Sequence, residues 1–178
     1  MDPMNERYRQ RYSTPFFEWD TTQTSKKLQV LEDPLKVKAI DGTGFKSTLG
    51  NMDFLPGERY YFQISVVKGR LLKIGVSRRD VDLEEAFCNT EHGWAIYNGE
   101  LRHNSTSSGK KYGEKLKAGD LIGVLVDMVD GRLSFSRNGE DWGVAYESPE
   151  LAQGTLCPAV AMLYPEDEFA LELTQPED

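Results

Sequence analysis

The side chains best suited to chemistry in this sequence are two cysteines and two histidines: Cys88, His92, His103 and Cys157. Cys88 and His92 are close enough in sequence to suggest a thiol beside a base, the arrangement that a cysteine nucleophile requires. The competing interpretation is a small core cysteine next to a loop histidine, because His92 stands among Asn, Thr and Glu residues. We favour the second interpretation and predict no catalytic residue.

Metal and phosphate sites are not indicated either. The four Cys and His residues lack the paired short spacings of a structural zinc site. The run SSGK at residues 107–110 lacks the earlier glycine and the preceding strand of a phosphate-binding loop. Asp127 and Asp130 flank a turn without the spacing of a calcium loop. The sequence therefore predicts neither a metal site nor a cofactor, and the chain is not predicted to be an enzyme.

Aromatic residues carry more functional information, with three Trp, eight Tyr and eight Phe in the chain. Some are in phase with aliphatic neighbours and belong to a core. Others stand beside predicted turns and strand ends, namely Phe87, Tyr97, Trp142 and Tyr164. Aromatic side chains on loops at one end of a rigid sandwich are typical of partner-binding surfaces. The alternative is that they only cover sheet edges; as a group, they favour a binding face.

Composition and charge restrict the class of partner. The chain has 178 residues, of which 39% are hydrophobic and 28% charged, as in one soluble globular domain. Its formal net charge of -8 argues against nucleic acid or an anionic membrane as the main partner, because phosphate binding needs clustered Lys and Arg. No apolar run reaches the roughly 18 residues of a membrane span. The few cysteines and the polar N-terminus predict a cytoplasmic location; a nuclear or cytoskeleton-associated location is the alternative.

The elements that must position these side chains have the period of two that indicates β-strands. Apolar and polar residues alternate over residues 60–67, 72–76, 133–136 and 169–174. Residues 121–126 are nearly all apolar, which predicts a central strand covered on both faces. Asp-Gly or Asn-Gly pairs separate the apolar runs at 41–42, 98–99, 130–131 and 138–139. The pattern predicts an all-β protein with antiparallel strands in a sandwich or barrel.

Helical signals are few. The run DLEE at residues 82–85 resembles a capping box and predicts one or two helical turns leading to residue 88. A second short helix is expected within residues 3–11. Residues 1–15 are predicted to be a flexible or short helical lead-in, residues 16–174 the folded domain and residues 175–178 an acidic tail.

A longer run resembles a known family. DLIGVLVDMVDGRLSFSRNGEDWGVAY at residues 120–146 resembles the signature of the SPRY domain, and LCPAV at residues 156–160 resembles its Phe-Pro-Ala-Val strand. GVSR at residues 75–78 is similar to the family's Gly-Val-Ala-Arg strand. Upstream, FEWDTT at residues 17–22 and GERYYF at residues 57–62 resemble diverged motifs of the PRY segment. The form is most similar to the C-terminal domain of tripartite-motif ubiquitin ligases and fibronectin-type-III/SPRY proteins.

This resemblance implies a bent, jelly-roll-like antiparallel β-sandwich that binds proteins and does no catalysis itself. It places the partner pocket on loops at one end of the sandwich and on the concave sheet. Carried over residue by residue, it implies partner-binding roles for Arg78, Phe87, Tyr97, Trp142, Leu163 and Tyr164. Arg78 would offer a fork of donors to a partner carboxylate or carbonyl.

The resemblance further implies the recognition domain of a larger ubiquitin-ligase-type or cytoskeletal scaffold protein, with any ligase activity in other domains. The partner would be a peptide or a protein epitope whose identity the sequence does not give. Two alternatives remain at this point. One is a carbohydrate-binding sandwich in which exposed aromatic rings stack on sugars, by analogy of fold. The other is a structural or dimerising domain that associates into a homo-oligomer through an open sheet edge.

Overall fold

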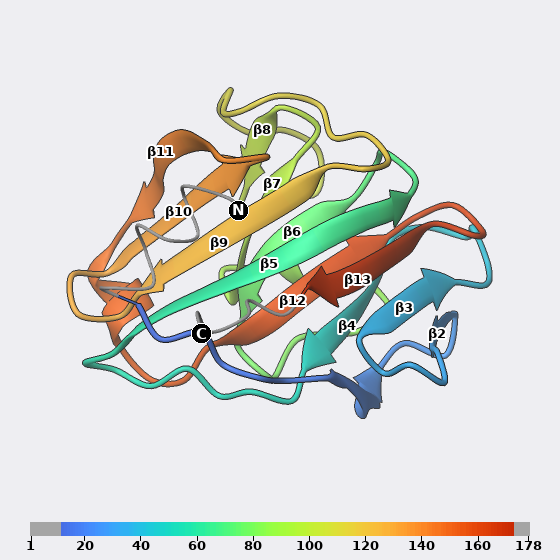
Figure 1. Cartoon of the computed structure of the whole chain (residues 1–178), viewed down its shortest axis with the longest axis horizontal. Coiled ribbons are helices and arrows are strands. Elements are labelled where there is room, and N and C mark those ends of the chain that lie inside the picture. Colours follow the sequence, from blue (N-terminus) through green and yellow to red (C-terminus); the bar gives the residue numbers. More distant parts are fainter. Residues whose placement is uncertain (1–11, 173–178) are drawn as a thin grey trace, which may run out of the picture.

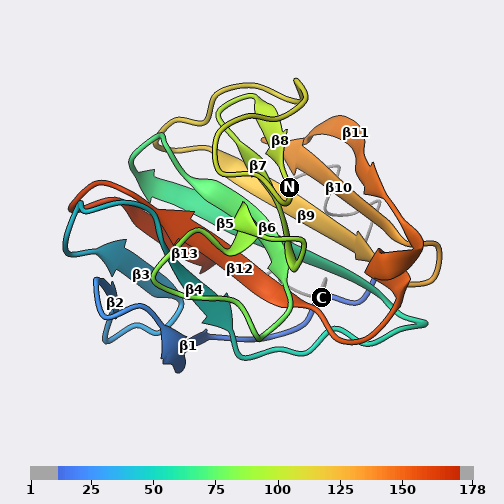
Figure 2. The same cartoon turned by 180° about the vertical axis from the view of Figure 1, so that it is seen from behind.

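Two layers of antiparallel strands form the protein in the computed structural model, which describes residues 12–172 (Figures 1 and 2). The front layer of Figure 1 is a seven-stranded sheet in the order β11-β10-β9-β5-β13-β3-β2. Its strands are β2 (Leu28–Val30), β3 (Lys36–Ala39), β5 (Arg59–Lys68), β9 (Leu121–Asp127), β10 (Arg132–Arg137), β11 (Glu140–Glu147) and β13 (Glu168–Glu172).

The second layer lies behind it and is a six-stranded sheet in the order β1-β4-β12-β6-β7-β8. Its strands are β1 (Trp19–Thr24), β4 (Lys46–Gly50), β6 (Lys73–Ser77), β7 (Gly93–Tyr97), β8 (Glu100–Arg102) and β12 (Cys157–Met162). The predicted all-β antiparallel sandwich is therefore confirmed. Two short 3-10 helices complete the secondary structure, η1 (Phe87–Asn89) and η2 (Pro149–Ala152). Neither helix in residues 12–172 is long and apolar enough to cross a membrane.

The main core lies between the two sheets, because one face of each alternating strand is apolar. β9 lies between β5 and β10 and is buried from Ile122 to its end, which confirms the predicted central strand. Aromatic rings pack edge to face at one side of this core, with Phe17 contacting both Trp19 and Phe62. The other largest core side chains are Phe54, Phe135, Phe169, Ile64, Leu72, Ile74 and Ile122.

A second apolar cluster covers the outer face of the six-stranded sheet. The chain between β6 and β7 folds back over this face and buries Phe87 and Cys88 of η1 against Ala95 and Ala159. The approach is close enough that a Cβ on Gly93 would lie 2.1 Å from the Phe87 carbonyl oxygen. The helical turns predicted over 82–88 form only at their end, as η1. At their start, the Asp82 side chain accepts the Glu84 backbone N–H and closes a turn instead.

The strand registers bring two sets of loops to opposite ends of the sandwich. β6 begins at Lys73, which pairs with Tyr97 at the end of β7 and with Ala161 near the end of β12. We call this the Tyr97 end; the loops before β4, after β7, between β10 and β11 and after β12 all meet there. The opposite end carries the loops after β4, after β6 and before β12.

The tight turns agree with the sequence. Asn98 and Gly99 have φ of 49° and 84°, and Asn138 and Gly139 have 51° and 85°, as a two-residue hairpin turn with the strand's own twist requires. Upstream of the predicted boundary at residue 16, Ser13 already pairs with Tyr60 of β5. The helix expected within residues 3–11 and the tail at 175–178 lie outside the described residues.

The edges of both sheets are short or irregular in the described part of the chain. β2 and β8 have three residues each, and β1 and β11 pair with their neighbours through shifts of register. Long regular ladders occur only in the interior of the sheets, for example between β5 and β9.

Candidate functional site

Tyr97 occupies the centre of the Tyr97 end. It is the last residue of β7 and lies between Lys73 of β6 and Glu100 of β8. Its half-buried ring meets Phe45, in the loop before β4, edge to face at a centroid distance of 5.5 Å. Burial raises the pKa of Tyr97, Arg102 acts in the opposite direction, and Glu100 and Tyr164 act in the same direction as burial. Tyr97 and the loop that carries Tyr164 lie at the same end of the sandwich, because β6 pairs Lys73 with both Tyr97 and Ala161.

Two cations flank the same ring. Lys73 Nζ lies 5.1 Å from the Tyr97 ring centroid and 4.0 Å from that of Phe45. Arg102 Cζ, on β8, lies 5.0 Å from the Tyr97 centroid. Positive charge over an aromatic face is attracted by the ring quadrupole. Because the site is buried, the pKa of Lys73 is lowered.

The loop after β12 supplies Leu163, half-buried, and Tyr164, which is 50% exposed. The buried carboxylate of Asp167 holds this loop, because its Oδ2 accepts the Tyr164 backbone N–H at 3.1 Å. The Asp167 backbone N–H in turn donates to the Tyr164 carbonyl at 3.1 Å. Tyr164 is therefore an exposed aromatic side chain on a backbone that is fixed from both sides.

Trp142, on β11, also lies at this end but its ring is covered. Tyr112 meets it edge to face at 6.0 Å, and the Arg137 guanidinium lies 5.3 Å from its centroid. The Tyr112 hydroxyl donates to the Gly143 carbonyl at 2.6 Å, which ties the loop before β9 to β11. Trp142 thus packs against the main core and closes the side of the sandwich.

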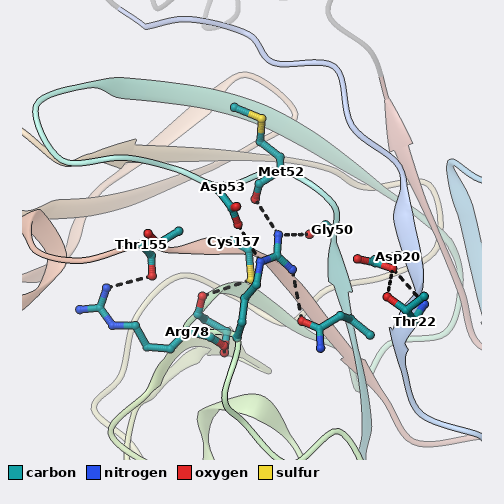
Figure 3. Close-up of polar contacts among 11 residues, drawn as sticks. Asp20, Thr22, Gly50, Met52, Asp53, Arg78, Thr155 and Cys157 are labelled. Carbon is teal, nitrogen blue, oxygen red and sulfur yellow. Dashed lines mark hydrogen bonds and ion pairs between the residues drawn. The ribbon is translucent and has the colours of Figure 1, made fainter.

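Arg78 lies at the opposite end, five residues along β6 from Lys73, which is roughly 16 Å in an extended strand. Its guanidinium already has three acceptors: the carbonyls of Gln153 at 2.6 Å, Glu150 at 2.7 Å and Thr155 at 3.1 Å. Figure 3 shows the side chain extended toward Thr155. These bonds hold the segment around η2, so Arg78 does not join Tyr97 and Tyr164 in one pocket.

Phe87 does not reach the surface. It is 1% exposed and belongs to the apolar cluster under the chain between β6 and β7. A contact between this ring and a partner would require η1 to leave the sheet. The structure therefore places Tyr97, Leu163 and Tyr164 at one end of the sandwich, Arg78 at the opposite end and Phe87 inside a buried cluster.

The cysteines and histidines are not arranged for nucleophilic catalysis. Burial raises the pKa of Cys88 and raises that of Cys157 to about 12, so both thiols hold their protons at neutral pH. His92 Nδ1 contacts Asp80 Oδ1 at 2.8 Å on the surface. Within residues 12–172, no group of three or more His, Cys, Asp or Glu residues could hold a metal ion.

The comparison with known families follows the same strands. The profile of the SPRY domain matches residues 59–175, which is most of the chain. The chain belongs to the SPRY family. SPRY domains are protein-interaction modules that are in general not catalytic.

Solved SPRY domains share the fold. The crystal structure of the SPRY domain of human HERC1 superposes with a TM-score of 0.72 at 22% identity, covering 89% of this chain and 99% of that one. The PSpry domain of TRIM65 gives a TM-score of 0.74 at 14% identity, covering 97% and 96%. The sandwich is thus common to proteins of very different sequence.

Relatives in sequence are longer proteins. The SPRY domain is 30% identical over 112 residues to the ATP-dependent RNA helicase Ddx1 of Drosophila melanogaster, which is 62% of this chain and 15% of that protein. It is 30% identical over 92 residues to human Ran-binding protein 9, which is 49% of this chain and 12% of that protein. The chain therefore spans only a small part of the relatives it matches.

Sequence reasoning missed Lys73, Arg102 and Phe45. Lys73 shares its strand face with Gly75 and Ser77, in phase opposite to Ile74 and Val76. Such a lysine in a strand is usually solvent-exposed. Lys73 is buried by Phe45, from the loop before β4, and by Tyr97 of β7. The sequence around Lys73 therefore carried no signal of its burial.

Proposed function

We propose that this SPRY domain recognises a peptide or protein epitope at the Tyr97 end, with Leu163, Tyr164 and the rim of Tyr97 as contacts. The observation that carries the proposal is Tyr164, which is 50% exposed beside half-buried Leu163 on a loop held by Asp167. An exposed aromatic on a fixed backbone offers contact area at little entropic cost. The domain would select a partner for a larger ligase-type or scaffold protein in the cytoplasm.

The geometry favours a protein partner over a sugar. Stacking on a sugar needs an open ring face, and the rings of Trp142 and Tyr97 are only half exposed, with the guanidinium groups of Arg137 and Arg102 beside them. Tyr164 is the exposed aromatic of the group. A single projecting ring beside aliphatic surface matches a protein epitope, in which a few anchors carry most of the binding energy.

The test is affinity capture from cell lysate with three forms of the domain, read by mass spectrometry. The forms are wild type, the double variant Tyr97→Ala/Tyr164→Ala, and Leu55→Ala. Leu55 is 52% exposed at the opposite end, so it controls for loss of surface hydrophobicity. We expect partners that the wild type and Leu55→Ala retain and the double variant loses. Identical partners for all three, with melting temperatures unchanged, would move the interaction to another surface.

A further inference from the structure

Two buried cations lie at the Tyr97 end, and one of them, Arg102, has buried donors without acceptors in the described chain. Lys73 is 4% exposed and Arg102 is 6% exposed. Lys73 Nζ and Arg102 Cζ lie 5.1 Å and 5.0 Å from the Tyr97 ring centroid. We call them the cation pair. Arg102 Nε and Nη1 are buried and have no hydrogen-bond partner in the described chain. No hydrogen bond or ion pair joins Lys73 Nζ to any residue in 12–172; the Phe45 and Tyr97 ring centroids lie 4.0 Å and 5.1 Å from it.

The local charge does not balance. Glu100 is the one carboxylate that acts on the pair within the described residues, through a 2.8 Å bond from Arg102 Nη2 to its Oε1. Its other oxygen accepts the Gly109 backbone N–H at 3.1 Å. Cys88 is nearby but its pKa is raised by burial, so it stays neutral. Two positive charges therefore face one negative charge, which leaves one charge and several donors uncompensated.

Such an arrangement is unfavourable in the free protein. A buried donor without an acceptor costs about 1–3 kcal/mol, and an unpaired charge costs more. Buried cations are usually paired with carboxylates or with a ligand. The protein has a net charge of -8, so a buried cluster of positive charge is unusual in it. Such a cluster at the proposed binding end suggests a negatively charged ligand group.

We infer that the cation pair is a subsite for one carboxylate of an acidic side chain from the partner epitope. A single carboxylate supplies one negative charge, which balances Lys73, and two oxygens that accept from Arg102 Nε and Nη1 in the side-on geometry of a guanidinium–carboxylate pair. The half-buried Tyr97 ring lies within 5.1 Å of both cations, so the inference requires this ring to move when the carboxylate enters. This inference rests on the proposed function and names the chemistry that the epitope must carry.

The test is a nuclear magnetic resonance titration of the isotope-labelled chain with two capped tripeptides, N-acetyl-Ala-Glu-Ala-amide and its Gln analogue. We expect the Glu peptide to shift the Arg102 Nε–H signal and the Tyr97 amide at millimolar concentration, with a Kd about tenfold below that of the Gln peptide. Lys73→Met and Arg102→Lys should each remove this tenfold preference. Lys26→Met is the matched control, because it removes the same charge from an exposed turn and should change nothing.

Three outcomes of the titration would overturn the inference, and a fourth comes from affinity capture. One is equal shifts with the Glu and Gln peptides; another is a Lys73→Met variant that keeps the preference. The third is tighter binding of inorganic phosphate than of the Glu peptide, which would assign the cation pair to a phosphate group. Overlay of the amide spectra confirms that each variant is folded. If Lys73→Met still captures partners that Tyr97→Ala/Tyr164→Ala loses, the carboxylate subsite fails while the proposed function stands.

Discussion

Arg78 and Gln153 are joined by a 2.6 Å hydrogen bond from the guanidinium Nη1 to the backbone carbonyl, which links the end of β6 to the segment after η2. The same side chain donates to two further carbonyls, so this arginine, expected from its family position to face a partner, works inside the molecule. Its guanidinium carries five N–H donors in a rigid planar fork, so one side chain reaches three separate carbonyls.

Arg78→Met should therefore lower the free energy of unfolding by about 2 kcal/mol, because charged hydrogen bonds are lost and three carbonyls must find water instead. Capture of partners at the Tyr97 end should remain. Urea denaturation measures the first effect, and the affinity capture described above measures the second. Loss of partners by a fully folded Arg78→Met domain would return this residue to the binding surface.

Replacement by alanine should affect stability strongly at one aromatic position and hardly at another. Phe87→Ala removes a fully buried ring from the outer cluster and should cost about 3–5 kcal/mol of stability. Tyr164→Ala removes an exposed ring and should change stability by less than about 0.5 kcal/mol. Thermal unfolding of both variants separates the two cases, and a strongly destabilised Tyr164→Ala would show that its ring is part of the core.

Lys73→Met should stabilise the domain, because it replaces a desolvated charge with an apolar side chain of similar length. A gain of about 1 kcal/mol would raise the melting temperature by roughly 2–4 °C. Differential scanning calorimetry provides the measurement, with Lys26→Met as the exposed control. An equal or lower melting temperature for Lys73→Met would mean that its two aromatic contacts outweigh the desolvation of the charge.

The same gain should depend on pH. Burial lowers the folded-state pKa of Lys73 below its unfolded value of about 10.5, so the unfolded chain binds the proton more tightly. The penalty is fully present below the folded pKa and fades as the pH rises toward the unfolded value. The difference in melting temperature between Lys73→Met and wild type should therefore shrink between pH 7 and about pH 10.5. A constant difference across this range would contradict the lowered pKa.

Thiol reactivity gives an independent check on the core. Both cysteines of the chain are buried, and burial raises both pKa values, that of Cys157 to about 12. Ellman's reagent at pH 8 should find almost no reactive thiol in the native protein and two per chain in guanidinium chloride. Rapid modification of one thiol in the native state would show that η1 leaves the sheet, because Cys88 belongs to η1 and is buried against the sheet.

Local pattern was sufficient for the strands but not for the site. β9 was predictable because a continuous apolar run fits only a strand covered on both faces, and the Asn98 turn because its residues tolerate positive φ. The burial of Phe87 depends on small residues of strands far away in sequence, such as Ala159. Lys73 and Arg102 become neighbours only through the register of β6, β7 and β8, which no local spacing encodes.

The short and irregular outer strands have a consequence for how this domain can assemble. A peptide that adds itself to a sheet needs a straight row of free backbone groups several residues long. Across residues 12–172, the outermost strands offer three residues in β2 and β8 and a shifting register in β1 and β11. If the domain recognises partners as proposed, side chains on loops must carry the contact, and such loops can change without disturbing a ladder bond of the sandwich.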